Sequence, residues 1–165
     1  MKNNIKLLDG SMSYPLELDG YNLNNRLWTG NALIDNPELI KKIHLGYINS
    51  GADYLLTSTY QISYDILREK GINSEKIKEV FQKSLDLAKN AIMESKTKKV
   101  IKIVASLGPY ASYKKNASEY VGIYDSTDDE IYNFHFNNLN VIKEIDYEIV
   151  LYETCLLYTS PSPRD

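Results

Sequence analysis

The sequence contains 165 residues, with 19 Lys and Arg against 22 Asp and Glu, for a net charge of −3 at pH 7. A chain of this length can bury a substantial core, and we expect a single domain. The mild acidity and the lack of a basic stripe argue against nucleic acid as a partner. No apolar run reaches the roughly 20 residues that a membrane span requires, so we predict a cytoplasmic protein with no membrane partner.

The first strand and the first loop are predicted near the N-terminus. Residues 5–8 are a short apolar run that stops at Asp9-Gly10, a pattern typical of a buried strand followed by a turn. Residues 22–29 are polar and have no period, which indicates a loop that contains Trp28.

Two helices and a strand are predicted next. Asn36-Pro37-Glu38 marks a helix start, with a capping side chain, proline at the first helical position and an acid in the first turn. Gly51 stands where this helix should end, and residues 54–57 predict the second strand. A long helix follows, capped by Ser74. Its apolar face consists of Ile77, Val80, Phe81, Leu85, Ala88 and Ile92.

The last part of the chain continues this alternation. Residues 100–105 predict a third strand of the continuously apolar kind that is covered on both faces of a parallel sheet. A loop follows, and Thr127 with Glu130 then forms a capping box for another helix. Residues 147–152 predict the fourth strand.

The elements alternate β-α four times without a hairpin signal, which predicts an α/β fold with a parallel sheet. A doubly wound sheet and a barrel both have this order. Polar residues stand at the C-terminal end of each strand, at Asp9, Thr57 to Gln61, Ser106 to Tyr110, and Glu153. In a (β/α)8 barrel these ends form the mouth of the active site, and four βα units are half of such a barrel.

Asp9 and Glu153 are the paired carboxylates of this rim. If the sheet closes into a barrel, both face one cavity, where they can hold an ammonium group, ligate a metal or act as acid and base. The structural alternative is an aspartate that caps a turn and a glutamate that faces solvent. Thr57 and Gln61 either contact a substrate or cap the next helix, and Trp28 either walls the pocket or packs on the protein body.

The two histidines are predicted to be structural, and a group of tyrosines has two possible roles. Neither His44 nor His135 has Cys, Asp or Glu at ligand spacing, so we predict that both are packing residues. A set of tyrosines close in sequence either forms a lid over the mouth or covers a surface. These are Tyr110, Tyr113, Tyr120 and Tyr124.

Residues 155–165, CLLYTSPSPRD, have no apolar period and resemble one reading frame of a sequencing adapter. We therefore expect residues 1–154 to be the N-terminal half of a longer barrel domain and residues 155–165 to be a non-native tail. Cys155, the single cysteine of the sequence, belongs to that tail and is not expected to ligate a metal.

A series of short motifs runs through residues 5–154. They are Leu7-Leu8-Asp9-Gly10-Ser11, Leu16-Glu17, Leu27-Trp28, Asn36-Pro37-Glu38 with His44 and Tyr47, Gly51-Ala52-Asp53, Thr57-Ser58-Thr59-Tyr60-Gln61, Gly108-Pro109-Tyr110, Ser118-Glu119-Tyr120 with Gly122 and Tyr124, and Glu153-Thr154. In this order and spacing, they resemble the homocysteine S-methyltransferase family.

The resemblance implies a (β/α)8 TIM barrel that transfers a methyl group to the thiol of homocysteine and so makes methionine. It assigns Asp9 and Glu153 to the amino group of the substrate, and it places Thr57, Gln61 and Trp28 around homocysteine. The implied methyl donor is a sulfonium compound, either S-methylmethionine or S-adenosylmethionine. The resemblance says nothing of the oligomeric state.

In the family, a zinc ion held by three cysteines binds the thiol. A free thiol has a pKa of about 8.5 and is mostly protonated at neutral pH, whereas a thiol bound to the metal is deprotonated. Residues 1–154 contain no cysteine. We therefore expect part of the amino-acid site here, none of the metal site, and no methyl transfer by this polypeptide alone. Two alternatives stay open: a non-catalytic module that binds or senses homocysteine, and an unrelated barrel enzyme with an Asp/Glu acid–base pair.

Overall fold

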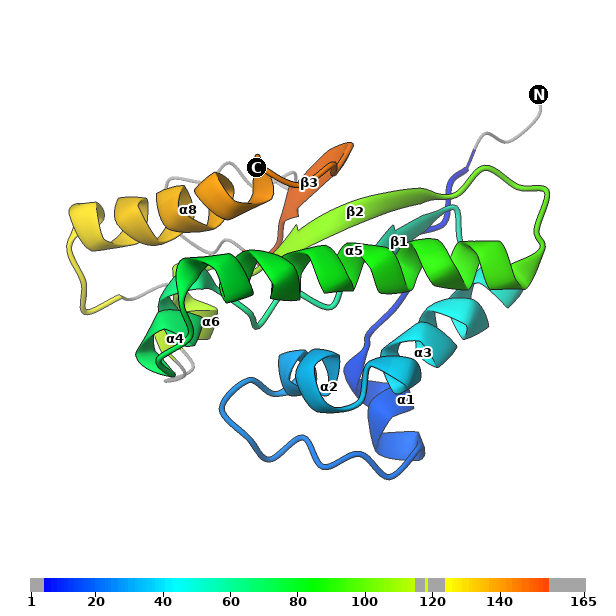
Figure 1. The fold of residues 1–165 in the computed structure, drawn as a ribbon, viewed down its shortest axis with the longest axis horizontal. Helices are drawn as coiled ribbons and strands as arrows, with labels where there is room; N and C mark the ends of the chain where they lie inside the picture. The colour runs from blue at the N-terminus through cyan, green and yellow to red at the C-terminus, as the bar shows by residue number, and fades with distance from the viewer. Residues whose placement is uncertain (1–4, 115–117, 119–123, 155–165) are drawn as a thin grey trace.

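A computed structural model describes residues 5–114, 118 and 124–154. Its sheet consists of parallel strands in the order β1 (Tyr54–Leu56), β2 (Lys102–Leu107) and β3 (Ile149–Tyr152). Leu8 adds a parallel bridge to Tyr54 on the free side of β1. Helices connect the strands (Figure 1), so the predicted α/β class with a parallel sheet is confirmed.

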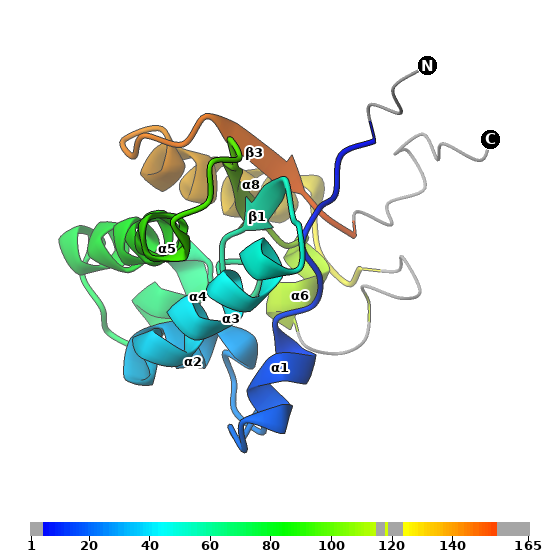
Figure 2. The ribbon, with the colours of Figure 1, turned by 90° about the vertical axis from the view of Figure 1, so that its right-hand side faces the viewer.

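The structure also describes a set of helices. They are α1 (Ser13–Leu18), α2 (Thr29–Asp35), α3 (Pro37–Asn49), α4 (Tyr64–Glu69), α5 (Ser74–Ser95), α6 (Tyr110–Lys114) and α8 (Asp128–Ile142). α3 and α5 pack against each other and cover one face of the sheet, where α3 contacts β1 and α5 contacts β2 (Figure 2). Among the helices of the described ranges, none is long and apolar enough to cross a bilayer.

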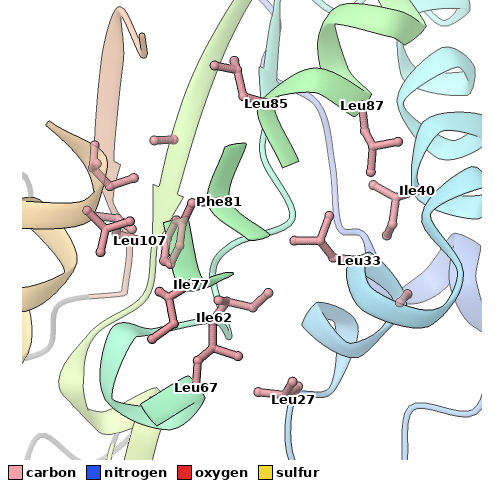
Figure 3. Packing of buried hydrophobic residues seen from close by; sticks show 14 of the residues in the cluster. Leu27, Leu33, Ile40, Ile62, Leu67, Ile77, Phe81, Leu85, Leu87 and Leu107 are labelled. Carbon is pink, nitrogen blue, oxygen red and sulfur yellow. The ribbon is translucent and has the colours of Figure 1, made fainter. Parts of the chain in front are cut away.

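The main hydrophobic core lies between these helices and the sheet. Phe81 of α5 is turned towards the end of β2 that carries Leu107, and Leu87 of α5 is turned towards Ile40 of α3 (Figure 3). All four side chains are buried. Because each buried aliphatic or aromatic side chain contributes roughly 1.5–3 kcal/mol, this layer holds α3 and α5 on the sheet.

The predicted buried strand over residues 5–8 is wrong. Leu8 alone pairs in the manner of a strand, and 72% of the Ile5 surface is exposed. The segment is still tied to β1, since the Leu7 carbonyl accepts from the Asp53 N–H at 2.7 Å. No strand of the described ranges pairs with its outer side, so the segment lacks the second neighbour that would bury it.

Two other predicted strands begin later than expected. β2 begins at Lys102 because pairing with β1 starts there, where the Lys102 N–H donates to the Asp53 carbonyl at 3.0 Å. Val100, in the predicted range, is 81% exposed. β3 begins at Ile149, since Tyr147 turns instead towards α5 and its hydroxyl donates to the Phe81 carbonyl at 2.8 Å.

The helix starts are largely as predicted. α3 has Pro37 as its first residue, although the Asn36 side chain makes no capping hydrogen bond. α5 is capped by Asn73, and the predicted cap Ser74 is its first helical residue. The capping box that opens α8 at Thr127 is confirmed.

Two short helices, α1 and α6, form where the sequence pattern shows none. Both have at most six residues, too few for a helical period to be recognised. α1 is held by Leu16, which is fully buried, and α6 begins directly after Pro109. Tertiary packing therefore decides these elements rather than intrinsic propensity.

Candidate functional site

The five residues selected from the sequence line one cavity of about 460 Å³ at the C-terminal ends of the strands. They are Asp9, Trp28, Thr57, Gln61 and Glu153. The convergence of Asp9, Thr57 and Glu153 follows from the parallel sheet, because strands that run in one direction end at one edge. Their roles towards a substrate stay predictions.

Asp9 stands where the N-terminal segment leaves β1. Its N–H donates to the Tyr54 carbonyl at 3.0 Å, and its carboxylate Oδ2 accepts from the Leu56 N–H at 3.0 Å. The other oxygen, Oδ1, is buried and has no hydrogen-bond partner among the residues that the structure describes. Burial, together with the negative charge of Glu153, raises the pKa of Asp9 to about 7, against the lowering effect of the Leu56 hydrogen bond. A carboxylate of this kind is suited to receive a cation.

Glu153 follows the last residue of β3 and is held at two points. Its N–H donates to the Leu107 carbonyl at 3.0 Å, which continues the pairing of β3 with β2. Its carboxylate Oε1 accepts a hydrogen bond from the Ser106 hydroxyl. The sequence places Ser106 at the rim but gives it no role, because a serine at a strand end has no pattern that marks its partner.

Thr57 closes β1 and belongs to a buried group of hydroxyls. Its Oγ1 accepts from the Ser106 N–H at 3.1 Å and lies 2.7 Å from the Oγ1 of Thr59. The Thr59 hydroxyl in turn donates to the Ser106 carbonyl at 2.7 Å. These bonds join the ends of β1 and β2 beneath the cavity.

Trp28 reaches the cavity from the start of α2 with an unusual backbone. Its backbone angles, φ of 47° and ψ of −120°, lie in a region that residues other than glycine rarely adopt. Strain of this kind persists only where the surroundings impose it, and it gathers at functional sites. The next turn is fixed by Gly30, since a Cβ there would lie 2.7 Å from Cγ1 of Ile62. This close approach packs α2 against the turn that carries Gln61.

The other candidates lie away from the cavity or pack in the interior. His44 is fully buried, and burial lowers its pKa to about 4. His135 lies edge-on to Tyr152 at 5.2 Å, and burial lowers its pKa as well. Both positions agree with a packing role.

The predicted tyrosine group forms an aromatic cluster against α8. The rings of Tyr113 and Phe134 lie 5.6 and 5.3 Å from that of Tyr110, and the Tyr124 ring lies 6.4 Å from it. Tyr120 lies outside the described residues. The described members therefore make a packed cluster.

The described residues do not fit the zinc centre that the resemblance implies. In residues 5–114, 118 and 124–154, no group of three or more His, Cys, Asp or Glu side chains could hold a metal ion. Cys155 lies outside these ranges. No metal is therefore assigned to the residues of this cavity.

Comparison with known proteins agrees with this geometry. The family model described as homocysteine S-methyltransferase matches residues 6–159, which extends into the segment predicted to be non-native. A homocysteine S-methyltransferase of Bacillus subtilis is 32% identical over 155 residues, which cover 90% of this chain and 49% of that protein. One from Arabidopsis thaliana is 34% identical over 160 residues, which cover 90% of this chain and 49% of that protein.

A solved structure shows the same likeness. The crystal structure of the Escherichia coli homocysteine methyltransferase in its metallated form aligns with a TM-score of 0.84 at 31% identity. The alignment covers 95% of this chain and 56% of that one. The chain spans about half the length of the curated relatives that it matches. On this match, the chain belongs to the homocysteine S-methyltransferase family.

Proposed function

We propose that this cavity binds the amino-acid end of homocysteine and that the intact protein transfers a methyl group to the homocysteine thiol. The observation that carries the proposal is the meeting of two carboxylates, Asp9 and Glu153, in one cavity. One of their oxygens, Oδ1 of Asp9, is buried without a hydrogen-bond partner within residues 5–114, 118 and 124–154.

A primary ammonium group complements this arrangement. It brings a positive charge and three N–H donors to a place where two acids repel each other and one oxygen lacks a donor. With a pKa of about 7, Asp9 is close to half protonated at neutral pH. Binding of an ammonium group favours the ionised form, so ligand binding near neutral pH should release protons.

The finer parts of the proposal come from the family. A sulfonium donor, S-methylmethionine or S-adenosylmethionine, supplies the methyl group, and methionine is the product. The strands described here form part of a (β/α)8 barrel, with residues 1–154 as its N-terminal half. Zinc would serve the intact enzyme, and its ligands would come from outside the described residues, which hold no group that could bind it. The cytoplasmic location and the absence of nucleic-acid partners stay predictions.

A non-catalytic homocysteine-binding or sensing module is the second candidate. Such a module requires only the cavity and no metal-binding group. Incubation of the intact protein with zinc, homocysteine and S-methylmethionine separates the two, because this chain alone is expected to give no turnover under either candidate. Methionine formation would support an enzyme, whereas binding without turnover agrees with a module that only binds.

Calorimetry tests the amino-group site directly. L-Homocysteine should bind, and 4-mercaptobutanoate, which lacks the amino group, should bind about 10–100-fold more weakly, as expected for the loss of a hydrogen bond between charged groups. Asp9→Asn and Glu153→Gln should each weaken the binding of L-homocysteine to a similar degree. Asp146→Asn, at an exposed aspartate away from the cavity, is the matched control. Equal binding of the two ligands would contradict the proposal.

A further inference from the structure

We propose that Ser106 is a positioning residue of this site, whose hydroxyl holds the Glu153 carboxylate in the cavity beside Asp9. The proposed ligand rests on the function given above, whereas the positioning of Glu153 stands on the geometry of the free protein. Ser106 is 2% exposed, lines the same cavity, and donates to Oε1 of Glu153.

The main chain of Ser106 is fixed by an unusual pairing. The regular pairing of β1 with β2 ends where the Thr57 N–H donates to the Val104 carbonyl at 2.9 Å. Ser106, two residues further along β2, points its N–H and carbonyl towards the same side as Val104. β1 has ended there, and the hydroxyls of Thr57 and Thr59 replace the missing strand.

These contacts form a closed ring of Ser106, Thr57 and Thr59. The Thr59 hydroxyl uses its one hydrogen on the Ser106 carbonyl at 2.7 Å. The 2.7 Å contact between Thr57 and Thr59 can therefore be donated only by Thr57, which also accepts from the Ser106 N–H. All three residues are buried, so water does not compete with these bonds. The ring holds the backbone from which the Ser106 side chain projects.

The ring also limits what Thr57 can offer a ligand. The Thr57 hydroxyl also meets the side chain of Tyr147, so its single hydrogen is used within the protein, on Thr59 or on Tyr147. Thr57 can therefore only accept a hydrogen bond from a ligand. An acceptor beside Asp9 and Glu153 suits an ammonium group rather than a carboxylate group of the substrate.

Glu153 is then anchored at both ends. Its backbone N–H donates to Leu107, the residue after Ser106, and its carboxylate receives the Ser106 hydroxyl. A glutamate side chain has several rotatable bonds, and without this donor it gains freedom to leave the cavity. Because Glu153 contributes to the raised pKa of Asp9, the titration of Asp9 reports where the Glu153 charge lies.

The test is the titration of the Asp9 carboxyl group by carbon-13 NMR, without ligand. Glu153→Gln defines the full effect, a fall in the pKa of Asp9. Ser106→Ala should lower that pKa in the same direction, and Ser106→Thr, which keeps a hydroxyl, should restore most of it. Ser112→Ala is the matched control, since this buried serine donates to the Pro109 carbonyl at 2.8 Å outside the cavity.

Homocysteine affinity gives the second readout. Ser106→Ala should weaken the binding of L-homocysteine about tenfold, which corresponds to the loss of one hydrogen bond to a charged group. It should leave the affinity for 4-mercaptobutanoate unchanged. An Asp9 titration that moves in Glu153→Gln but not in Ser106→Ala would overturn the proposal. A titration that moves in both variants, in a chain that does not bind homocysteine, would support the positioning role and refute the proposed ligand.

Discussion

Replacing Asp9 with Asn should stabilise the ligand-free protein at high pH and leave its stability at low pH nearly unchanged. The folded pKa of Asp9 is about 7, above its ordinary value of 3.8. The folded chain therefore holds this proton more tightly than the unfolded chain. The stability linked to it is complete below about pH 3.8 and is lost as the pH rises through 7.

The magnitude follows from the shift in pKa. About three pKa units correspond to about 4 kcal/mol at most, at 1.36 kcal/mol per unit. Asp9 lines a cavity that is open to solvent, which screens the charge, so we expect a gain of about 2 kcal/mol at pH 8. The Asn side-chain oxygen can still accept from the Leu56 N–H, so the hydrogen bond to β1 is kept.

Thermal unfolding of both proteins between pH 4.5 and pH 8 measures this difference. A gain of 2 kcal/mol corresponds to about 4–8 °C in the melting temperature of a chain of this size. His44 lowers the stability of the folded state as the pH falls from 6.5 to about 4, because its folded pKa is lowered by burial, but it is common to both proteins and cancels in the difference. An equal difference at both pH values, or a less stable variant at pH 8, would refute the reasoning.

Three further predictions concern glycine packing, helix capping and self-association. In a denaturant titration, Gly108→Ala should cost about 1–3 kcal/mol of stability, because the new Cβ would lie 2.4 Å from the Tyr60 carbonyl oxygen. Gly46→Ala is the control: it lies in the exposed interior of α3 with nothing within 4 Å of the new Cβ, and it should gain about 0.5–1 kcal/mol. Thr127→Ala should cost about 1 kcal/mol through the lost capping box, and an unchanged unfolding midpoint would contradict this. The exposed apolar edge at residues 5–8 should cause self-association, and Leu8→Lys should reduce it. Light scattering after gel filtration measures this, and an unsubstituted chain that is monomeric at high concentration would contradict the prediction.

The order of elements was accessible from the sequence because it depends on local patterns. The capping box at Thr127, Pro37 as a first helical residue and the apolar face around Phe81 are each encoded within a few turns. Strand limits were less accessible. Val100 is as apolar as a strand residue, yet pairing begins at Lys102 because its partner strand begins at Tyr54, 48 residues earlier in the chain.

The residues of the cavity were accessible for a similar reason. Asp9, Thr57 and Glu153 each follow a predicted strand, and parallel strands end at one edge. Ser106 was recognised at the rim without a role, because its importance comes from the partner that its hydroxyl meets. Hydrogen bonds between residues 47 positions apart leave no periodic trace in a sequence.

The sequence by itself determined the residue types at the rim, the alternation of strands and helices, and the likeness to one enzyme family. The tertiary structure alone decided that one oxygen of Asp9 has no hydrogen-bond partner in the described part of the chain and that buried hydroxyls replace the end of β1. The physical reason is that charge, burial and donor direction at this cavity depend on atoms that only the folded chain brings within hydrogen-bonding distance.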